Sequence, residues 1–116
     1  MQIRKLGHSN LRVSALCLGT MMFADQTDAR EAASILDSAR ERGVNFIDTA
    51  DVYSKGACER MLAPLLASGR DHWVLASKVG NPMSNRPNEN RLSRKWIVQS
   101  VEASLQRLGT DYLDIC

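Results

Sequence analysis

The stretch FIDTADVY, residues 46–53, holds the residues that point to both the fold and the chemistry of this chain. Its first residues are apolar, as in a buried strand, but the run ends at Asp48 and the chain then turns toward Tyr53. A carboxylate at the end of a hydrophobic strand is costly to desolvate unless it is paired. The stretch therefore predicts a partner for Asp48 at a neighbouring strand end.

Other apolar segments of the chain alternate with helical segments. Strands are predicted over 15–20, 44–48, 73–79 and 112–116, and the first, ALCLGT, reads as a strand buried on both faces. The strands start roughly 30–40 residues apart, which is the length of a strand–helix unit. This repeat predicts a parallel sheet, either an open doubly wound sheet or part of a (β/α)₈ barrel.

Capping residues delimit the predicted helices. One helix is expected between Asp28 and Gly43, with Glu31 completing a capping box, and another between Ser93 and Gly109. A less regular helix, suggested by Glu59, Leu62, Leu65 and Leu66 and expected to end near Gly69, contains Pro64, which predicts a kink or two short pieces. The segments 2–6 and 11–16 predict an opening hairpin. The last helix has a predicted apolar face of Ile97, Val101, Leu105 and Leu108.

The sequence favours the barrel over the nucleotide-binding doubly wound fold. That fold carries G-x-G-x-x-G in its first strand-to-helix turn, whereas LGTMMFAD (18–25) has one glycine, and no Walker pattern is present. A whole barrel needs about 200–250 residues, so we interpret residues 1–116 as the first portion of a longer protein. Two unpaired sheet edges would then predict marginal stability or self-association.

The composition is that of a globular domain. Apolar residues make up 44%, charged residues 24% and the net charge is +2, which disfavours nucleic acid or a membrane as partner. No secretory leader or bilayer-spanning run is visible. Three cysteines without metal-ligand spacing indicate reduced thiols in a cytoplasmic protein and no metal. The basic stretch around Arg86, Arg91 and Arg94 is interpreted as a solvated loop rather than a phosphate contact.

Polar residues end three of the predicted strands, at Gly19-Thr20, Asp48 and Lys78. Carboxyl ends of parallel strands are where α/β folds build their sites, and adjacent strands lie about 4.8 Å apart. Lys78 is therefore the predicted partner of Asp48, with Tyr53 leaning over the pair. An ammonium favours the deprotonated form of a nearby phenol, which suits proton transfer to a carbonyl oxygen.

The chain resembles the aldo-keto reductases in GVNFIDTADVY (43–53), WVLASKV (73–79), LSRKWIVQSVEASLQRLGTDYLDI (92–115) and LGTMMF (18–23). The resemblance covers essentially the whole chain and implies the N-terminal fragment of a single (β/α)₈ barrel domain, over residues 1–116. It implies NADPH-dependent reduction of aldehydes and ketones to alcohols. It also implies that Tyr53 is the general acid, that Lys78 assists it, that Asp48 holds Lys78, and that Gly19, Thr20 and Asp48 lie against the nicotinamide.

The resemblance also implies a fourth site residue, a histidine after a stretch like DYLDICYLH, whereas residues 111–116 read DYLDIC. Neither His8, in the hairpin turn, nor His72, before the third strand, is positioned to replace it. Residues 1–116 alone are therefore expected to show little or no reductase activity.

Two alternatives remain at this stage. One is a non-catalytic binding or regulatory module with the same fold, as in channel-associated relatives of the family. The other is a half-barrel that assembles with itself. The three groups Asp48, Tyr53 and Lys78 argue mildly against a pure scaffold, since a scaffold has no need of them together. The sequence specifies neither the carbonyl substrate, nor NADP over NAD, nor the oligomeric state.

Overall fold

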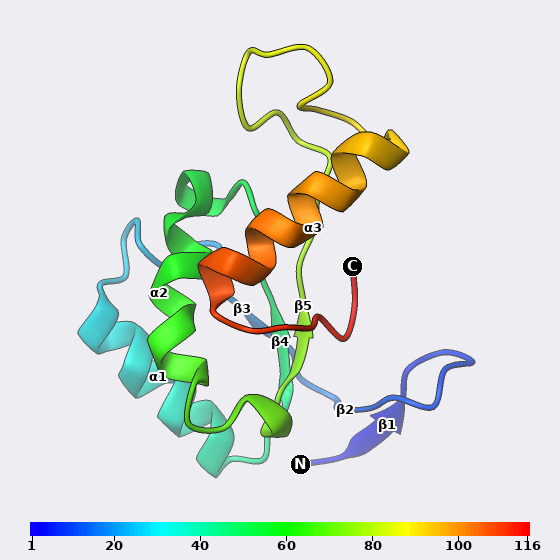
Figure 1. Cartoon of the computed structure of the whole chain (residues 1–116). Coiled ribbons are helices and arrows are strands. Elements are labelled where there is room, and N and C mark those ends of the chain that lie inside the picture. The colour runs from blue at the N-terminus through cyan, green and yellow to red at the C-terminus, as the bar shows by residue number, and fades with distance from the viewer.

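The computed structural model describes all 116 residues, and Figure 1 shows an opening hairpin followed by strands and helices in alternation. The hairpin is the antiparallel pair β1 and β2, in which Ile3 faces Ser14 and Lys5 faces Arg12. It lies apart from the helices in Figure 1. The elements are β1 (Ile3–Lys5), β2 (Arg12–Ser14), β3 (Leu18–Gly19), α1 (Ala29–Glu41), β4 (Phe46–Asp48), α2 (Ala57–Leu66), β5 (Val74–Ala76) and α3 (Arg94–Leu108).

A three-stranded parallel sheet in the order β3-β4-β5 organises the rest of the chain. Alternate residues of its strands point to opposite faces, and Ile47 and Leu75, both fully buried, point to the same one. They share a single core with α1, α2 and α3, so all three helices cover this face. A doubly wound sheet has helices on both faces. The structure therefore has the arrangement of a barrel wall, with its helices outside.

The helix boundaries predicted from capping residues are confirmed at α1 and α3. The Asp28 carboxylate accepts a hydrogen bond from the Glu31 amide at 2.9 Å, and the Ser93 hydroxyl accepts one from the Trp96 amide at 3.1 Å. Gly109 ends α3 in the left-handed conformation that glycine adopts without steric cost.

Two local predictions are corrected. The strand predicted over 15–20 is regular only at Leu18–Gly19, and Leu16 is 63% exposed rather than buried on both faces. β3 is an edge strand, and the helices cover only one side of the sheet. The break expected at Pro64 is also absent: α2 runs as one helix from Ala57 to Leu66. Pro64 lies in its last turn, where a missing amide removes a single hydrogen bond.

The buried face of α3 differs from the predicted one. Leu108 is buried as expected, but Ile97, Val101 and Leu105 are only half-buried. The buried row consists of positions four residues apart, Trp96, Ser100, Ser104 and Leu108. Helices pack by interlocking such ridges, and serines in a ridge allow a close approach to the neighbouring helix. α3 packs on α2.

The fourth strand, predicted over 112–116, is reduced to a parallel bridge between Ala76 and Ile115. A side chain replaces part of the expected ladder, since the Leu75 amide donates to the Asp114 carboxylate at 2.9 Å. The amides of Asp114 and Ile115 both donate to the Leu75 carbonyl. The edge of β5 is thus paired with the last residues of the chain, as a fourth strand would pair with it, although only one bridge forms.

A buried ion pair joins α2 to α3. Glu59 is fully buried, and its carboxylate accepts hydrogen bonds from Arg107 Nε at 2.6 Å and from the Ser77 hydroxyl at 2.7 Å. Gly56, just before α2, has φ 92°, and a Cβ there would lie 2.9 Å from Arg107 Cδ. Arg107 therefore passes directly over this glycine on its way to Glu59.

Replacing Arg107 by alanine is expected to lower the free energy of unfolding by about 3–5 kcal/mol, because Glu59 would keep a buried charge without its partner. Arg94→Ala, at the exposed start of the same helix, is the control and should change it by less than about 0.5 kcal/mol. Urea denaturation followed by circular dichroism measures both. An Arg107→Ala loss no larger than the control's would contradict the stabilising role of the pair.

Candidate active site

The register of the parallel strands brings the predicted site residues to one edge of the sheet. Gly19 is opposite Asp48, and Asp48 is opposite Ala76, two residues before Lys78. All three strands therefore end at the same level. As in other parallel sheets, the polar residues that follow the apolar runs converge there.

Lys78 is the partner of Asp48 that the sequence predicts. Its ammonium donates to both carboxylate oxygens, at 2.8 and 2.7 Å, and to the Thr49 carbonyl at 2.7 Å. The side chains of Lys78 and Asp48 remain 47% and 40% exposed, so the pair faces open space. Burial lowers the pKa of Lys78, but its hydrogen bond to Asp48 and the nearby Tyr53 outweigh this and hold the pKa above its ordinary value.

Tyr53 lies over the same pair. It begins a 3₁₀ turn, Tyr53–Gly56, in which Ser54 and Lys55 have φ values of 47° and 53°. This sharp turn leaves the Tyr53 ring against Lys78, with 5.0 Å between the ammonium nitrogen and the ring centroid. The structure thus brings together Asp48, Tyr53 and Lys78.

Gly19 and Thr20 have different surroundings. A Cβ added to Gly19 would meet no heavy atom within 4 Å, so the space beside Asp48 is open at this strand. Thr20 is 1% exposed, its hydroxyl donates to the Asp48 carbonyl at 3.0 Å, and it is in contact with the Cys58 thiol. Its side chain therefore ties β3 to β4, and a contact of Thr20 with a cofactor stays a prediction.

A cavity of about 490 Å³ adjoins this group of residues. It is lined by residues that follow β4, among them Tyr53, and by residues of the loop between β5 and α3, among them Lys78. The lining consists of Ala50, Asp51, Val52, Tyr53, Lys78, Val79, Gly80, Asn81, Arg91 and Leu92. Its volume is in the range of small-molecule sites.

Two acidic residues near the site have a burial that the sequence did not indicate. Asp51 is 1% exposed, and its Oδ2 has no hydrogen-bond partner. Burial, together with the nearby charge of Glu59, raises the pKa of Asp51. Glu59 lies in the first turn of α2, and its carboxylate accepts a hydrogen bond from Ser77, the neighbour of Lys78. One signal was available: Glu59 shares an i, i+3 spacing with the buried Leu62.

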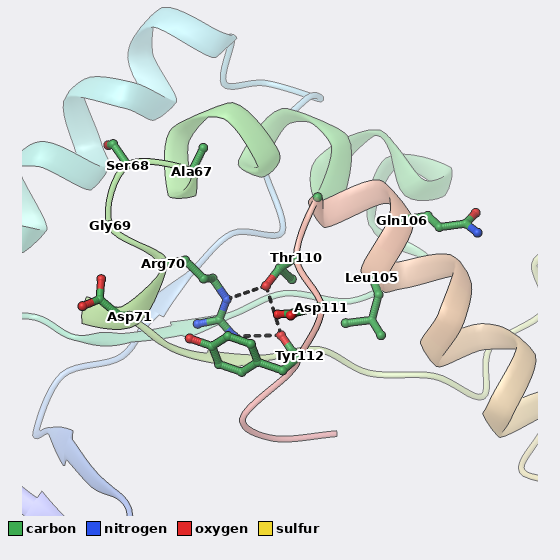
Figure 2. A pocket seen from close by; sticks show the side chains of 11 residues that line it. Ala67, Ser68, Gly69, Arg70, Asp71, Leu105, Gln106, Thr110, Asp111 and Tyr112 are labelled. Carbon is green, nitrogen blue, oxygen red and sulfur yellow. Dashed lines mark hydrogen bonds between the residues drawn. The ribbon is translucent and has the colours of Figure 1, made fainter.

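The largest hollow of the surface, about 950 Å³, lies away from these residues, between the end of α2 and the end of α3. Figure 2 shows that its one arginine, Arg70, is directed at Thr110 and Tyr112. The Arg70 guanidinium bonds the Thr110 hydroxyl, the Tyr112 carbonyl and the Asp114 carboxylate, and it lies 3.9 Å from the centre of the Tyr112 ring. These contacts fasten the last residues of the chain, so Arg70 is a structural clamp.

Histidines and metal ligands do not add to the site. His72 Nε2 is 3.1 Å from the Val44 carbonyl, and Val44 precedes β4, so His72 lies at the opposite end of the strands. No group of three or more His, Cys, Asp and Glu side chains is arranged to hold a metal ion. None of the helices combines the length and apolarity needed to cross a bilayer.

The comparisons with known proteins agree on one family. The model of the aldo/keto reductase family matches residues 15–116. A relative named "Probable voltage-gated potassium channel subunit beta" from Arabidopsis thaliana is 41% identical, over 99% of this chain and 36% of its own length. "Uncharacterized oxidoreductase YrpG" from Bacillus subtilis is 40% identical, over 99% of this chain and 39% of its own length.

Solved structures agree with the sequence relatives. The holo form of aldo-keto reductase AKR11C1 from Bacillus halodurans superimposes with a TM-score of 0.83 at 39% identity, over 97% of this chain and 38% of that one. The chain thus spans between a third and two fifths of the length of the curated relatives named above. Its fold is that of the N-terminal part of a (β/α)₈ barrel.

The pKa of Lys78 is expected to fall when Asp48 is replaced by asparagine, because burial alone lowers it and the carboxylate opposes that effect. Since the folded-state pKa is raised, the pair stabilises the fold fully below the unfolded lysine pKa of about 10.4. This contribution is lost as the pH rises through the folded-state pKa. NMR titration of the Lys78 Cε resonance measures the shift.

Asp37→Asn, on the exposed side of α1, is the matched control for this titration and should leave the Lys78 pKa where it is. An unchanged Lys78 pKa in Asp48→Asn would show that the carboxylate does not govern the charge of the lysine.

Proposed function

The chain belongs to the aldo/keto reductase family, and from that premise we propose that it forms the N-terminal part of a single barrel domain, over residues 1–116, that reduces an aldehyde or ketone to an alcohol with NADPH. The observation that carries the proposal is the ion pair of Lys78 with Asp48 directly beside the Tyr53 ring. The substrate is a small carbonyl compound. No metal takes part, and we propose a cytoplasmic location with no nucleic acid or membrane as partner.

The residues at the strand ends fit a nicotinamide ring. Gly19 has no side chain and faces open space beside Asp48, so a flat ring can approach the strand ends closely. Gly19, Thr20 and Asp48 would hold this end of the cofactor. When bound, the reduced nicotinamide supplies a hydride to the carbonyl carbon.

Tyr53 is the proposed general acid, and its hydroxyl gives a proton to the carbonyl oxygen as the alcohol forms. The phenolate that remains is next to the Lys78 ammonium, whose charge stabilises it. Asp48 keeps Lys78 charged and fixed, because the carboxylate accepts two of its hydrogen bonds. Each of the three residues thus has a distinct task in moving one proton.

A second candidate function rests on a specific relative. The 41% identical plant protein is named as a probable voltage-gated potassium channel subunit, and the alternative is that this chain is part of a non-catalytic binding or regulatory module with the same fold. In that case its partner would be a protein, and its function would be to bind that partner rather than to catalyse a reaction. The two candidates differ in whether the Tyr53 hydroxyl is needed.

Tyr53→Phe in the protein that carries this chain is expected to lower kcat for carbonyl reduction by about 100-fold or more, because the proton donor is lost while the ring remains. NADPH-linked absorbance with an aromatic aldehyde measures the rate. Tyr112→Phe is the matched control, since Tyr112 is the chain's other tyrosine and its ring packs on Arg70. It should keep kcat within about twofold.

The outcomes separate the two candidates. An active parent whose Tyr53→Phe variant keeps its kcat would refute Tyr53 as the acid. A parent without NADPH-linked turnover, which nevertheless binds a channel protein with the same affinity before and after Tyr53→Phe, would favour the subunit function.

A further inference from the structure

The cavity beside Tyr53 is lined by one cationic side chain that forms no ion pair with another residue of the chain. Of the charged residues that line it, Lys78 is paired with Asp48, and Asp51 is 1% exposed. The third, Arg91, is exposed and takes part in none of the side-chain hydrogen bonds of the fold. The ion pairs of the chain's cations engage Arg70, Lys78, Arg86 and Arg107.

The backbone holds Arg91 at the rim of this cavity. The loop between β5 and α3 closes on itself, because the Arg91 amide donates to the Gly80 carbonyl at 2.7 Å. Arg91 has φ 62°, a conformation that glycine adopts more readily than arginine does. Gly80, the acceptor of this hydrogen bond, is also closely packed, since a Cβ at Gly80 would lie 3.1 Å from Leu92 Cδ2. Arg91 is thus fixed by its neighbours at the base of the loop.

Nearby cations differ from Arg91 in their surroundings. Arg86 is paired with Glu89 within the loop. Arg94 and Lys95, on the first turn of α3, are not among the residues that line the cavity. Arg91 is therefore the one unpaired cation that faces the same space as Tyr53 and Lys78.

We propose that Arg91 binds a carboxylate on the substrate, so that this site takes oxo acids whose aldehyde or ketone group lies at Tyr53. A guanidinium offers two parallel N–H donors that match the two oxygens of a carboxylate. Val52, Val79 and Leu92 line the same cavity and suit an apolar body between the two polar ends. The inference rests on the proposed reductase function, because it takes Tyr53 as the point where the carbonyl is held.

The test uses the protein that carries this chain and two aldehydes of similar size, 4-formylbenzoate and its uncharged methyl ester. Arg91→Gln is expected to lower kcat/KM for 4-formylbenzoate at least about tenfold, mainly through KM, because a charge-assisted hydrogen bond is lost. It should leave kcat/KM for the ester within about twofold. Arg91→Gly keeps the left-handed backbone without strain and should show the same two results, a loss with 4-formylbenzoate and little change with the ester. Arg94→Gln is the control and should change neither.

An equal fall in kcat/KM for both aldehydes would show that Arg91 acts only through the structure of the loop. A raised KM for NADPH would show that Arg91 binds the cofactor. Either result would overturn the inference. No change for either aldehyde would overturn it too. Saturation-transfer NMR with 4-formylbenzoate and no cofactor tests Arg91 even if the parent shows no turnover. Binding that is lost in Arg91→Gln and kept in Arg94→Gln supports the inference while the reductase proposal fails. Binding that is equal in both variants overturns it.

Discussion

A carboxylate sealed inside a protein has to be neutralised by a partner, and Glu59 meets this constraint with groups from two other elements. Arg107 comes from α3 and Ser77 directly follows β5, while Glu59 itself belongs to α2. Ser77 is the residue before Lys78, and α2 follows directly on the turn that begins at Tyr53. The interaction that fixes two helices on the sheet therefore also fixes the two segments that carry the proposed acid and its neighbouring ammonium.

Asp48 and Glu59 carry the same charge in opposite surroundings. Glu59 is closed off from solvent, so its bonds are structural and leave nothing for a ligand. Asp48 lies at the open end of the strands and is partly exposed, although both its oxygens bind Lys78. The fold therefore separates a carboxylate that holds elements together from one that orients a charge at the mouth of the site. Asp51 lies between them in the sequence. It is buried and one of its carboxylate oxygens has no hydrogen-bond partner, so it belongs to neither class.

Local rules predicted the features that depend on few residues. The caps at Asp28 and Ser93, the hairpin, the parallel strands and the meeting of Asp48 with Lys78 follow from turn chemistry and from strand register. Features that depend on long-range packing were missed. Periodicity assigned the apolar row of α3 to the core, whereas the row that is buried in the fold contains Ser100 and Ser104. Nothing near Asp114 indicates that its carboxylate would replace a strand hydrogen bond, because Arg70, its partner, is 44 residues away.

The contact of Asp114 with β5 determines which hydrogen-bonding groups remain free at this edge of the sheet. An open strand edge is a template on which strands of other molecules can add, and this is a common start of aggregation. At β5 the Leu75 amide and carbonyl and the Ser77 amide are all taken by residues 114 and 115. Arg70 holds this short cover in position. Residues 114 and 115 thus occupy the hydrogen-bonding groups through which β5 would otherwise add a strand of another molecule.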